Sequence, residues 1–485
     1  MNVLFVASEV VPFSKTGGLA DVAGALPPHL KQCGCDIRVV TPYYKAVVQG
    51  RHSTISFVKE LVIPLGELNC SIQLFETVLK NSVKVYLVKC DEFFWRDNLY
   101  GTTSGDYEDN AERFILFARA VVEICLRIRF APAIIHCNDW QAGLVPAYIK
   151  TIYQHEPCFS KTAFVFSIHN IAYQGLFEAE AFDLTGLPAH LFSIGGCEYW
   201  GKLSMIKAGI VFSDIITTVS KKYSREIQTT EYGYGLEGIL RERSADLYGI
   251  LNGIDYDDWH PRHDPHISAR YSLKSLWRKK ICKQALIEEC GLAADVSARP
   301  LIGIISRLAD QKGFDLIAKR MSDIIMHGAA VVLLGTGDAK YERLFRCIGK
   351  RYPGRTSMNI MYDNRLAHKI EAGCDMFLMP SRYEPCGLNQ MYSLAYGTVP
   401  IVRATGGLDD TIVDVDEEPS RGTGYKFDSY DDAQLMAAIR RACSAFEDPK
   451  RWRQILLSGM RCDFSWDRSA REYIRLYEDA RRRKG

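Results

Sequence analysis

The sequence predicts an α/β protein built from two doubly wound, Rossmann-like domains. Short runs rich in β-branched residues alternate with longer segments of helical period, which is the order of a parallel sheet with crossover helices. The runs are apolar almost throughout, as strands buried on both faces of a sheet must be. This pattern occurs twice in a chain of 485 residues, which is too long for a single hydrophobic core.

The first half of the chain carries six strand candidates and one clear amphipathic helix. The helix covers residues 110–129, where apolar side chains recur at intervals of three and four. The predicted strands are residues 3–7, 37–41, 83–89, 134–137, 163–169 and 215–220.

The second half repeats this order, and its predicted strands are residues 301–306, 330–334, 359–362, 376–380 and 399–402. A polar segment with Asn-Gly, Trp and Pro separates the halves, so we place the domain boundary at about Gly253. The expected domains are 1–253 and 254–465, followed by an amphipathic C-terminal helix at 466–485.

Composition excludes several classes of function. Sixty Lys and Arg oppose 58 Asp and Glu, so no global field attracts nucleic acid or anionic lipid. The fifteen cysteines are scattered and form no Cys-x-x-Cys, which favours reduced thiols in a cytoplasmic protein. The first residues read as a strand rather than a signal peptide, and no apolar run is long enough to cross a membrane. We expect no metal ion and no cofactor.

Residues 15–21 (KTGGLAD) follow the first predicted strand and lead into a helix. Backbone N–H groups at Gly17 and Gly18, beside Lys15, are suited to a phosphate or a developing anion. A tight strand–helix turn is the simpler interpretation of paired glycines. The turn lacks the G-x-G-x-x-G spacing, which argues against a dinucleotide-dependent dehydrogenase.

Two further strands of the first half end in polar residues. Asp139 follows one of them, while His169 and Asn170 follow the next. Carboxylates and amides bind hydroxyl groups and aromatic rings cover apolar sugar faces, so these strand ends indicate a sugar pocket. The aromatic and acidic stretch 91–110, which ends at Asn110, is a candidate for the acceptor side.

In the second half, cations and a carboxylate follow predicted strands. Arg307 and Lys312 suit a diphosphate, as a guanidinium fork plus a point charge. Glu384 lies before a proline and a glycine-led helix start. The remaining candidates at these strand ends are Cys386, Gly387 and Leu388, and the expected anion nest Thr405, Gly406 and Gly407.

These motifs resemble those of bacterial glycogen synthases and plant starch synthases. The likeness extends from residue 1 to about 477, and the motifs keep their order. They are residues 15–21 (KTGGLAD), 169–175 (HNIAYQG), 232–240 (YGYGLEGIL), 252–255 (NGID), 306–313 (SRLADQKG), 380–388 (PSRYEPCGL) and 405–408 (TGGL).

The resemblance implies the GT-B fold, two Rossmann-like domains around a deep cleft, with the C-terminal helix returning to the first domain. It implies transfer of glucose from ADP-glucose to the non-reducing 4-OH of an α-1,4-glucan, with retention of configuration. The implied diphosphate ligands are Arg307 and Lys312, joined by Lys15, Gly17 and Gly18, and the implied ligand of the donor glucose is Glu384. The sugar and acceptor residues would be Asp21, Asp139, His169, Asn170 and Asn252, and Tyr362 would stack near the adenine.

The sequence leaves alternatives open. Many related retaining transferases have a second glutamate eight positions after the first, whereas this chain has Tyr392 there. A glucosyltransferase that uses UDP-glucose is the nearest alternative function. A glucan phosphorylase dependent on pyridoxal phosphate, or a non-catalytic glucan-binding relative, would share the architecture.

Overall fold

The computed structural model describes residues 1–102 and 105–484. Thr103 and Ser104 of the expected acceptor stretch, and Gly485 of the expected C-terminal helix, lie outside the described residues. The chain forms two compact units. The first contains Met1–Val219, Ser224–Gly253 and the chain from Trp466 onward, and the second contains Ser220–Tyr223 and Ile254–Ser465.

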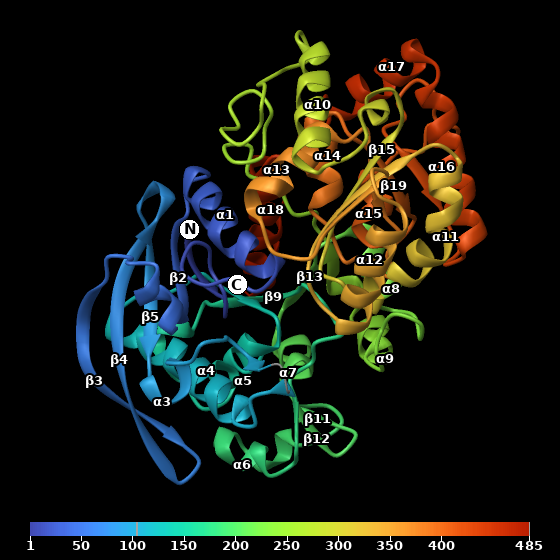
Figure 1. Ribbon diagram of the computed structural model, residues 1–485. Coiled ribbons are helices and arrows are strands. Elements are labelled where there is room, and N and C mark those ends of the chain that lie inside the picture. The colour runs from blue at the N-terminus through green and yellow to red at the C-terminus, as the bar shows by residue number, and fades with distance from the viewer. Residues whose placement is uncertain (103–104, 485) are drawn as a thin grey trace. The chain divides into compact units, whose positions relative to one another are not determined.

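The first unit is centred on a nine-stranded sheet with the order β14-β13-β9-β8-β1-β2-β5-β4-β3 (Figure 1). The strands from β14 to β5 are parallel, and β4 and β3 complete the sheet as an antiparallel hairpin. The strands of this sheet are β1 (Asn2–Val6), β2 (Asp36–Pro42), β3 (Ile55–Leu65), β4 (Leu68–Leu79), β5 (Val83–Lys89), β8 (Ile134–Asn138), β9 (Ala163–Ile168), β13 (Ile215–Thr218) and β14 (Leu247–Gly249).

Short strands and helices complete the first unit. The short strands are β6 (Gly101–Thr102), β7 (Gly105–Asp106), β10 (Leu176–Phe177), β11 (Glu198–Tyr199) and β12 (Lys202–Ser204). The helices are α1 (Gly18–Gln32), α2 (Lys45–Gln49), α3 (Asp91–Phe94), α4 (Asn110–Arg127), α5 (Val145–Lys150), α6 (Ala181–Thr185), α7 (Met205–Phe212), α9 (Glu237–Glu242) and α18 (Trp466–Lys484). Helix α8 (Lys221–Glu226) begins in the segment that is grouped with the second unit.

The C-terminal helix α18 packs on the same face of this sheet as α1, through Trp466, Tyr473 and Tyr477. The Tyr477 hydroxyl lies 2.7 Å from Nδ1 of His136 on β8, whose Nε2 lies 2.6 Å from the Ser167 hydroxyl on β9. Burial lowers the pKa of His136 to about 3, so its ring is neutral. A buried polar link thus fixes the last helix of the chain to the first sheet.

The second unit contains a six-stranded parallel sheet with the order β17-β16-β15-β18-β19-β20. Its strands are β15 (Leu301–Ile305), β16 (Ala330–Leu334), β17 (Thr356–Asn359), β18 (Met376–Met379), β19 (Val399–Arg403) and β20 (Tyr425–Phe427). Its helices are α10 (Lys279–Glu289), α11 (Phe314–Met326), α12 (Ala339–Arg351), α13 (Asn364–Gly373), α14 (Asn389–Tyr396), α15 (Gly406–Thr411), α16 (Asp432–Phe446) and α17 (Pro449–Gly459).

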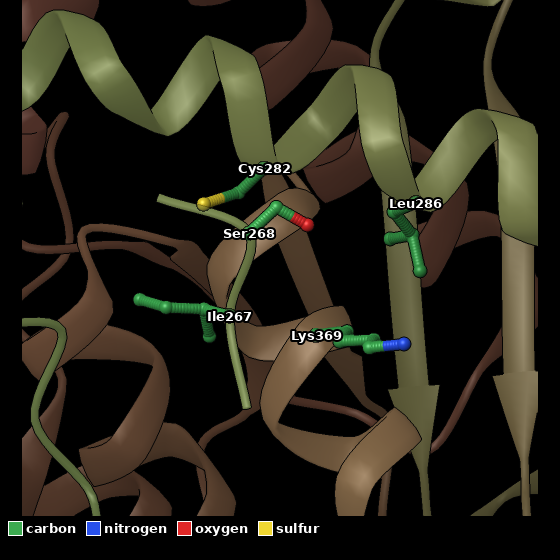
Figure 2. Close-up of a pocket in the computed structure, with 5 residues that line it drawn as sticks. All are labelled: Ile267, Ser268, Cys282, Leu286 and Lys369. Carbon is green, nitrogen blue, oxygen red and sulfur yellow. The ribbon is translucent and has the colours of Figure 1, made fainter. Parts of the chain in front are cut away.

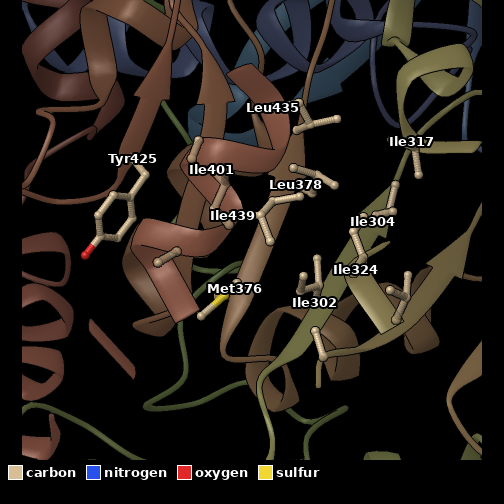
Figure 3. Close-up of a cluster of buried hydrophobic side chains, with 14 of the residues drawn as sticks. Ile302, Ile304, Ile317, Ile324, Met376, Leu378, Ile401, Tyr425, Leu435 and Ile439 are labelled. Carbon is tan, nitrogen blue, oxygen red and sulfur yellow. The ribbon is translucent and has the colours of Figure 1, made fainter. Parts of the chain in front are cut away.

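Apolar side chains of the second sheet are buried on both faces. Ile302 and Ile304 of β15 join Leu378, Ile401 and side chains of α11 and α16 in one cluster (Figure 3). Leu301, their neighbour along the strand, belongs to a second cluster with side chains of α10 and α13. Successive residues of a strand point to opposite faces, so both faces of the sheet carry helices.

The two ends of the longer segment of the second unit lie side by side. The backbone N–H of Ile254 donates to the carbonyl oxygen of Phe464 at 2.8 Å, and Ile254 pairs with Ser465 in a parallel bridge.

In the described part of the chain, no helix combines the length and apolarity that a membrane crossing requires. All fifteen cysteines are free thiols.

The α/β fold class predicted from the sequence is confirmed, but several strands differ from the prediction, and the edge strands β14 and β20 were not predicted. Residues 359–362 were expected as a strand, but β17 ends at Asn359 because its pairing with β16 stops there. The β3–β4 hairpin was not predicted. Exposure alternates between Leu61 and Leu65 in the structure, but the residues there are apolar throughout (LVIPL), so the sequence shows no period of two.

Ile401 offers a test of the second core, because its side chain is fully buried in the cluster of Figure 3. We expect Ile401→Ala to cost about 2–5 kcal/mol, since it removes buried methyl groups and leaves a cavity. Chemical denaturation followed by tryptophan fluorescence measures this loss. Met326→Ala is the control, because Met326 is 76% exposed and should leave the transition unchanged. Equal transitions for both variants would contradict the packing described.

Candidate functional site

In the first unit, polar residues lie at the point in the sheet where the order of successive strands reverses. The chain passes from β1 to β2 on one side, while β8 pairs with β1 on the other, so the switch point lies between β1 and β8. Ligands of open α/β sheets bind at such points, outside the carboxyl ends of the strands. Glu9, Asp139 and His169 follow β1, β8 and β9, which are neighbours in the sheet.

Asp139 and His169 are joined directly. The backbone N–H of His169 donates to Oδ1 of Asp139 at 2.7 Å, and Nε2 of His169 lies 2.9 Å from the side-chain oxygen of Asn138. Asp139 has φ 53° and ψ −179°, a strained backbone conformation that is otherwise largely confined to glycine. The structure therefore brings these two predicted site residues together.

The protonation states of this pair follow from burial. The pKa of Asp139 is raised to about 7, mainly by desolvation. The charge of Glu9 acts in the same direction, whereas hydrogen bonds from the backbone N–H groups of His169 and Asn170 lower the pKa. Desolvation lowers the pKa of His169 to about 4. A neutral imidazole thus lies beside a carboxyl group that titrates near neutrality, and together they can donate to and accept from hydroxyl groups.

The backbone N–H groups of the turn at residues 15–18 were expected to bind an anion, and a carboxylate of the protein itself accepts two hydrogen bonds from this backbone. The Glu9 carboxylate accepts hydrogen bonds from the backbone N–H of Thr16, from the Thr16 hydroxyl at 2.6 Å and from the backbone N–H of Gly17 at 3.2 Å. Lys15 pairs with Asp21 at 2.7 Å and remains half exposed. The protein's own carboxylate therefore occupies the inner side of this turn.

The three predicted asparagines lie in different surroundings. Asn110 is buried, donates to the Tyr100 carbonyl oxygen at 2.8 Å and accepts from Arg113 at 2.6 Å, so it supports the loop that precedes α4, and its binding of substrate stays a prediction. Asn170 accepts from the backbone N–H of Ala172 at 3.1 Å. Asn252 is buried, and its side-chain oxygen has no hydrogen-bond partner within the described residues.

In the second unit, the switch point lies between β15 and β18. Lys312 and Glu384, which follow these two strands, are in contact: Nζ lies 2.6 Å from Oε2. The Ser381 hydroxyl donates to the same oxygen at 3.0 Å, and Glu384 is only 6% exposed. Arg307 lies exposed at the end of β15. The expected cations and carboxylate thus share one end of the second sheet.

Gly406 and Gly407 pack closely against the segment that carries Glu384. The backbone N–H of Gly407 donates to the carbonyl oxygens of Glu384 and Pro385, at 3.1 Å each. A Cβ at Gly406 would lie 2.0 Å from the Glu384 carbonyl oxygen, and one at Gly407 would lie as close to that of Cys386. These glycines let α15 support the backbone on which Glu384 is held, and the binding of an anion by Thr405, Gly406 and Gly407 stays a prediction.

The other predicted residues of the second unit vary in exposure. Cys386 is buried, Gly387 has a positive φ of 71°, and Leu388 directly precedes α14. Tyr362 is 83% exposed in the loop after β17, so its ring is open to a stacking partner.

A hollow too tight for a water molecule lies elsewhere in this unit and holds none of the predicted residues (Figure 2). It is lined by Ile267, Ser268, Cys282, Leu286 and Lys369.

Two family models match the chain: the starch synthase catalytic domain over residues 2–242 and glycosyl transferases group 1 over residues 294–455. The glycogen synthase of Koribacter versatilis is 48% identical over 481 residues, which cover 99% of this chain and 98% of that protein. The chain belongs to the glycogen and starch synthase family. It is therefore a glucosyltransferase of the GT-B type, as the motifs predicted.

Two further comparisons agree with this membership. The glycogen synthase of Geotalea uraniireducens is 46% identical, and the alignment covers both chains completely. The catalytic domain of starch synthase IV from Arabidopsis thaliana, solved with ADP and acarbose, superposes with a TM-score of 0.92. Its sequence is 32% identical, and the match covers 99% of each chain.

Glu9, Tyr100 and Ser381 are neighbours of the candidate residues that sequence reasoning did not include. Glu9 directly follows Ser8 at the end of β1, so its position after a buried strand was an available signal. The Tyr100 hydroxyl donates to Glu9 at 2.8 Å from a loop 91 residues away in sequence, which no local pattern reveals.

Among the described residues, no cluster of three His, Cys, Asp or Glu could hold a metal ion.

Asp139 makes the stability of the first unit depend on pH. Its folded pKa of about 7 exceeds the value of 3.8 for the free side chain, so the folded state binds an extra proton between these pH values and loses stability as pH rises. We expect Asp139→Asn to be more stable than the parent at pH 8, by on the order of 4 kcal/mol, since the pKa difference is about three units at about 1.4 kcal/mol each. Calorimetry from pH 4 to 8 should show this gain vanish toward pH 4. A gain that is constant with pH would contradict the raised pKa.

Proposed function

We propose that this chain transfers glucose from ADP-glucose to the non-reducing 4-OH of an α-1,4-glucan, with retention of configuration at the anomeric carbon. The observation that carries the proposal is the Lys312–Glu384 pair at the switch point of the second sheet. A relative of the same fold, starch synthase IV, is described with ADP and acarbose bound, which supports an adenine nucleotide and a glucan-like sugar as ligands.

The second unit supplies the donor ligands in this proposal. Arg307 and Lys312 bind the diphosphate, and Glu384 holds the donor glucose through its hydroxyl groups. Lys312 contacts Glu384 at 2.6 Å, so both side chains are already positioned before a sugar diphosphate binds beside them. Tyr362, with most of its ring in solvent, offers the surface on which the adenine stacks.

The first unit supplies the sugar and acceptor ligands. Asp139 and His169 accept and donate hydrogen bonds at the acceptor hydroxyls. Asn170, from the same motif as His169, and Asp21, from the motif at residues 15–21, are further sugar ligands. The unpartnered side-chain oxygen of Asn252 suits a sugar hydroxyl. Lys15 and the N–H of Gly18 contribute a cation and a donor for phosphate.

The chemistry requires stabilisation of a departing diphosphate. The bond between the anomeric carbon and the phosphate oxygen breaks, and the acceptor oxygen bonds to the same face of that carbon. The proton of the acceptor hydroxyl passes to the leaving phosphate oxygen. Arg307 and Lys312 neutralise the charge on that oxygen, an effect for which each well-placed donor contributes about 3–4 kcal/mol. Burial holds Glu384 in a fixed position against the donor sugar.

The donor is identified by measuring nucleotide release with glycogen present. We expect ADP-glucose to give the higher kcat/KM, because the exposed ring of Tyr362 provides a surface for adenine. UDP-glucose is the comparison substrate, and release without glycogen is the blank. Preference for UDP-glucose would overturn the donor assignment, whereas no release from either donor would overturn the proposed function.

Glu384 is tested by replacement with an isosteric neutral group. We expect Glu384→Gln to lower kcat by about 100–1000-fold, since it removes the charge that faces the donor sugar and Lys312. The matched control is Glu342→Gln on the surface helix α12, which should retain parental activity. Circular dichroism confirms that both variants are folded. Full activity of Glu384→Gln would remove this residue from the mechanism.

A further inference from the structure

Glu9 is a buried carboxylate whose hydrogen bonds join two segments of the first unit. It is only 4% exposed. Its Oε2 accepts the backbone N–H groups of Thr16 and Gly17, and its Oε1 accepts the hydroxyl groups of Thr16 and Tyr100. Four donors thus converge on one side chain, and three of them come from the turn at residues 15–18.

The turn is held from its inner side and open on its outer side. A Cβ added at Gly17 or Gly18 would meet no described atom within 4 Å. Lys15, at the start of the turn, is half exposed. The carboxylate therefore fixes the backbone of the turn, while the space beside Gly17 and Gly18 is open and the Lys15 ammonium group, paired with Asp21, is partly in solvent.

Tyr100 connects this carboxylate to the loop that precedes α4. Its hydroxyl also lies 2.7 Å from the Ser8 hydroxyl, and its carbonyl oxygen accepts from Asn110 at 2.8 Å. Asn110 in turn accepts from Arg113, a fully buried guanidinium that also donates to the Leu99 carbonyl oxygen. A continuous set of hydrogen bonds thus runs from the loop to the turn.

We propose that Glu9 is a positioning residue that shapes the turn at residues 15–18 for the donor and ties it to the loop carrying Tyr100. For its effect on activity, this inference rests on the proposed function. Glu9 acts by geometry. The two backbone N–H groups at Oε2 cannot reverse their direction, whereas the two hydroxyls at Oε1 can rotate to become acceptors.

This difference makes glutamine a discriminating substitution. In Glu9→Gln, the amide oxygen can take the place of Oε2 and the NH₂ group can donate to the two hydroxyls, so the turn keeps its shape without the charge. Glu9→Ala removes every one of these bonds. Tyr100→Phe removes only the connection to the loop, and Thr16→Ala removes only one hydroxyl from an exposed residue.

Two measurements test the proposal: steady-state kinetics with ADP-glucose and hydrogen–deuterium exchange of the peptide that contains residues 15–22. We expect Glu9→Ala to raise the donor KM about tenfold and to speed exchange at the turn, while Glu9→Gln stays within about threefold of the parent in KM and exchanges like it. Glu60→Ala, on the exposed part of the β3 strand, is the control.

Several outcomes would overturn this inference. Equal impairment of Glu9→Gln and Glu9→Ala would assign the effect to charge, and parental exchange in Glu9→Ala would remove the structural role. If Glu9→Ala does not fold, Thr16→Ala and Tyr100→Phe replace it, and parental KM and exchange in both would overturn the proposal. If the parent protein transfers no glucose, the proposed function fails, yet slow exchange in Glu9→Gln and fast exchange in Glu9→Ala would still establish the positioning role.

Discussion

Burial of parallel strands on both faces is the constraint on which the rest of this molecule depends. A strand such as β8 or β15 has helices above and below it, so its interior positions hold mainly apolar side chains. Charged and hydrogen-bonding groups are therefore displaced to the ends of the strands. The carboxyl ends of neighbouring parallel strands share one edge, and this brings residues that are distant in sequence within reach of each other.

Each unit uses this arrangement at its own switch point. In the first, Asp139 and His169 are joined through a backbone hydrogen bond and desolvated together. In the second, Lys312 and Glu384 form an ion pair with little exposure. Buried ion pairs often add little to the stability of a fold, so this pair is by itself weak evidence of a structural role.

Most strands of the two parallel sheets, and the polar residues that follow their ends, could be predicted because they depend on local sequence. The roles of the glycines could not. Paired glycines predict a turn, but whether Gly407 faces a ligand or the carbonyl oxygen of Glu384 depends on the packing of α15 against another loop. The partners of Asn110 could not be predicted for the same reason, since Tyr100 and Arg113 are brought to it by tertiary structure. The partners of Glu9 also come from two separate loops.

The adjacent ends of the longer segment of the second unit have an evolutionary and practical consequence. Because Ile254 pairs with Ser465, this stretch enters and leaves its own fold at nearly the same point. Segments of this kind can be excised or exchanged with little disturbance to the host chain, since their termini need no long linker. A chimera that receives residues 254–465 from a homologue would inherit a complete six-stranded sheet, so these two positions are suitable points for recombination.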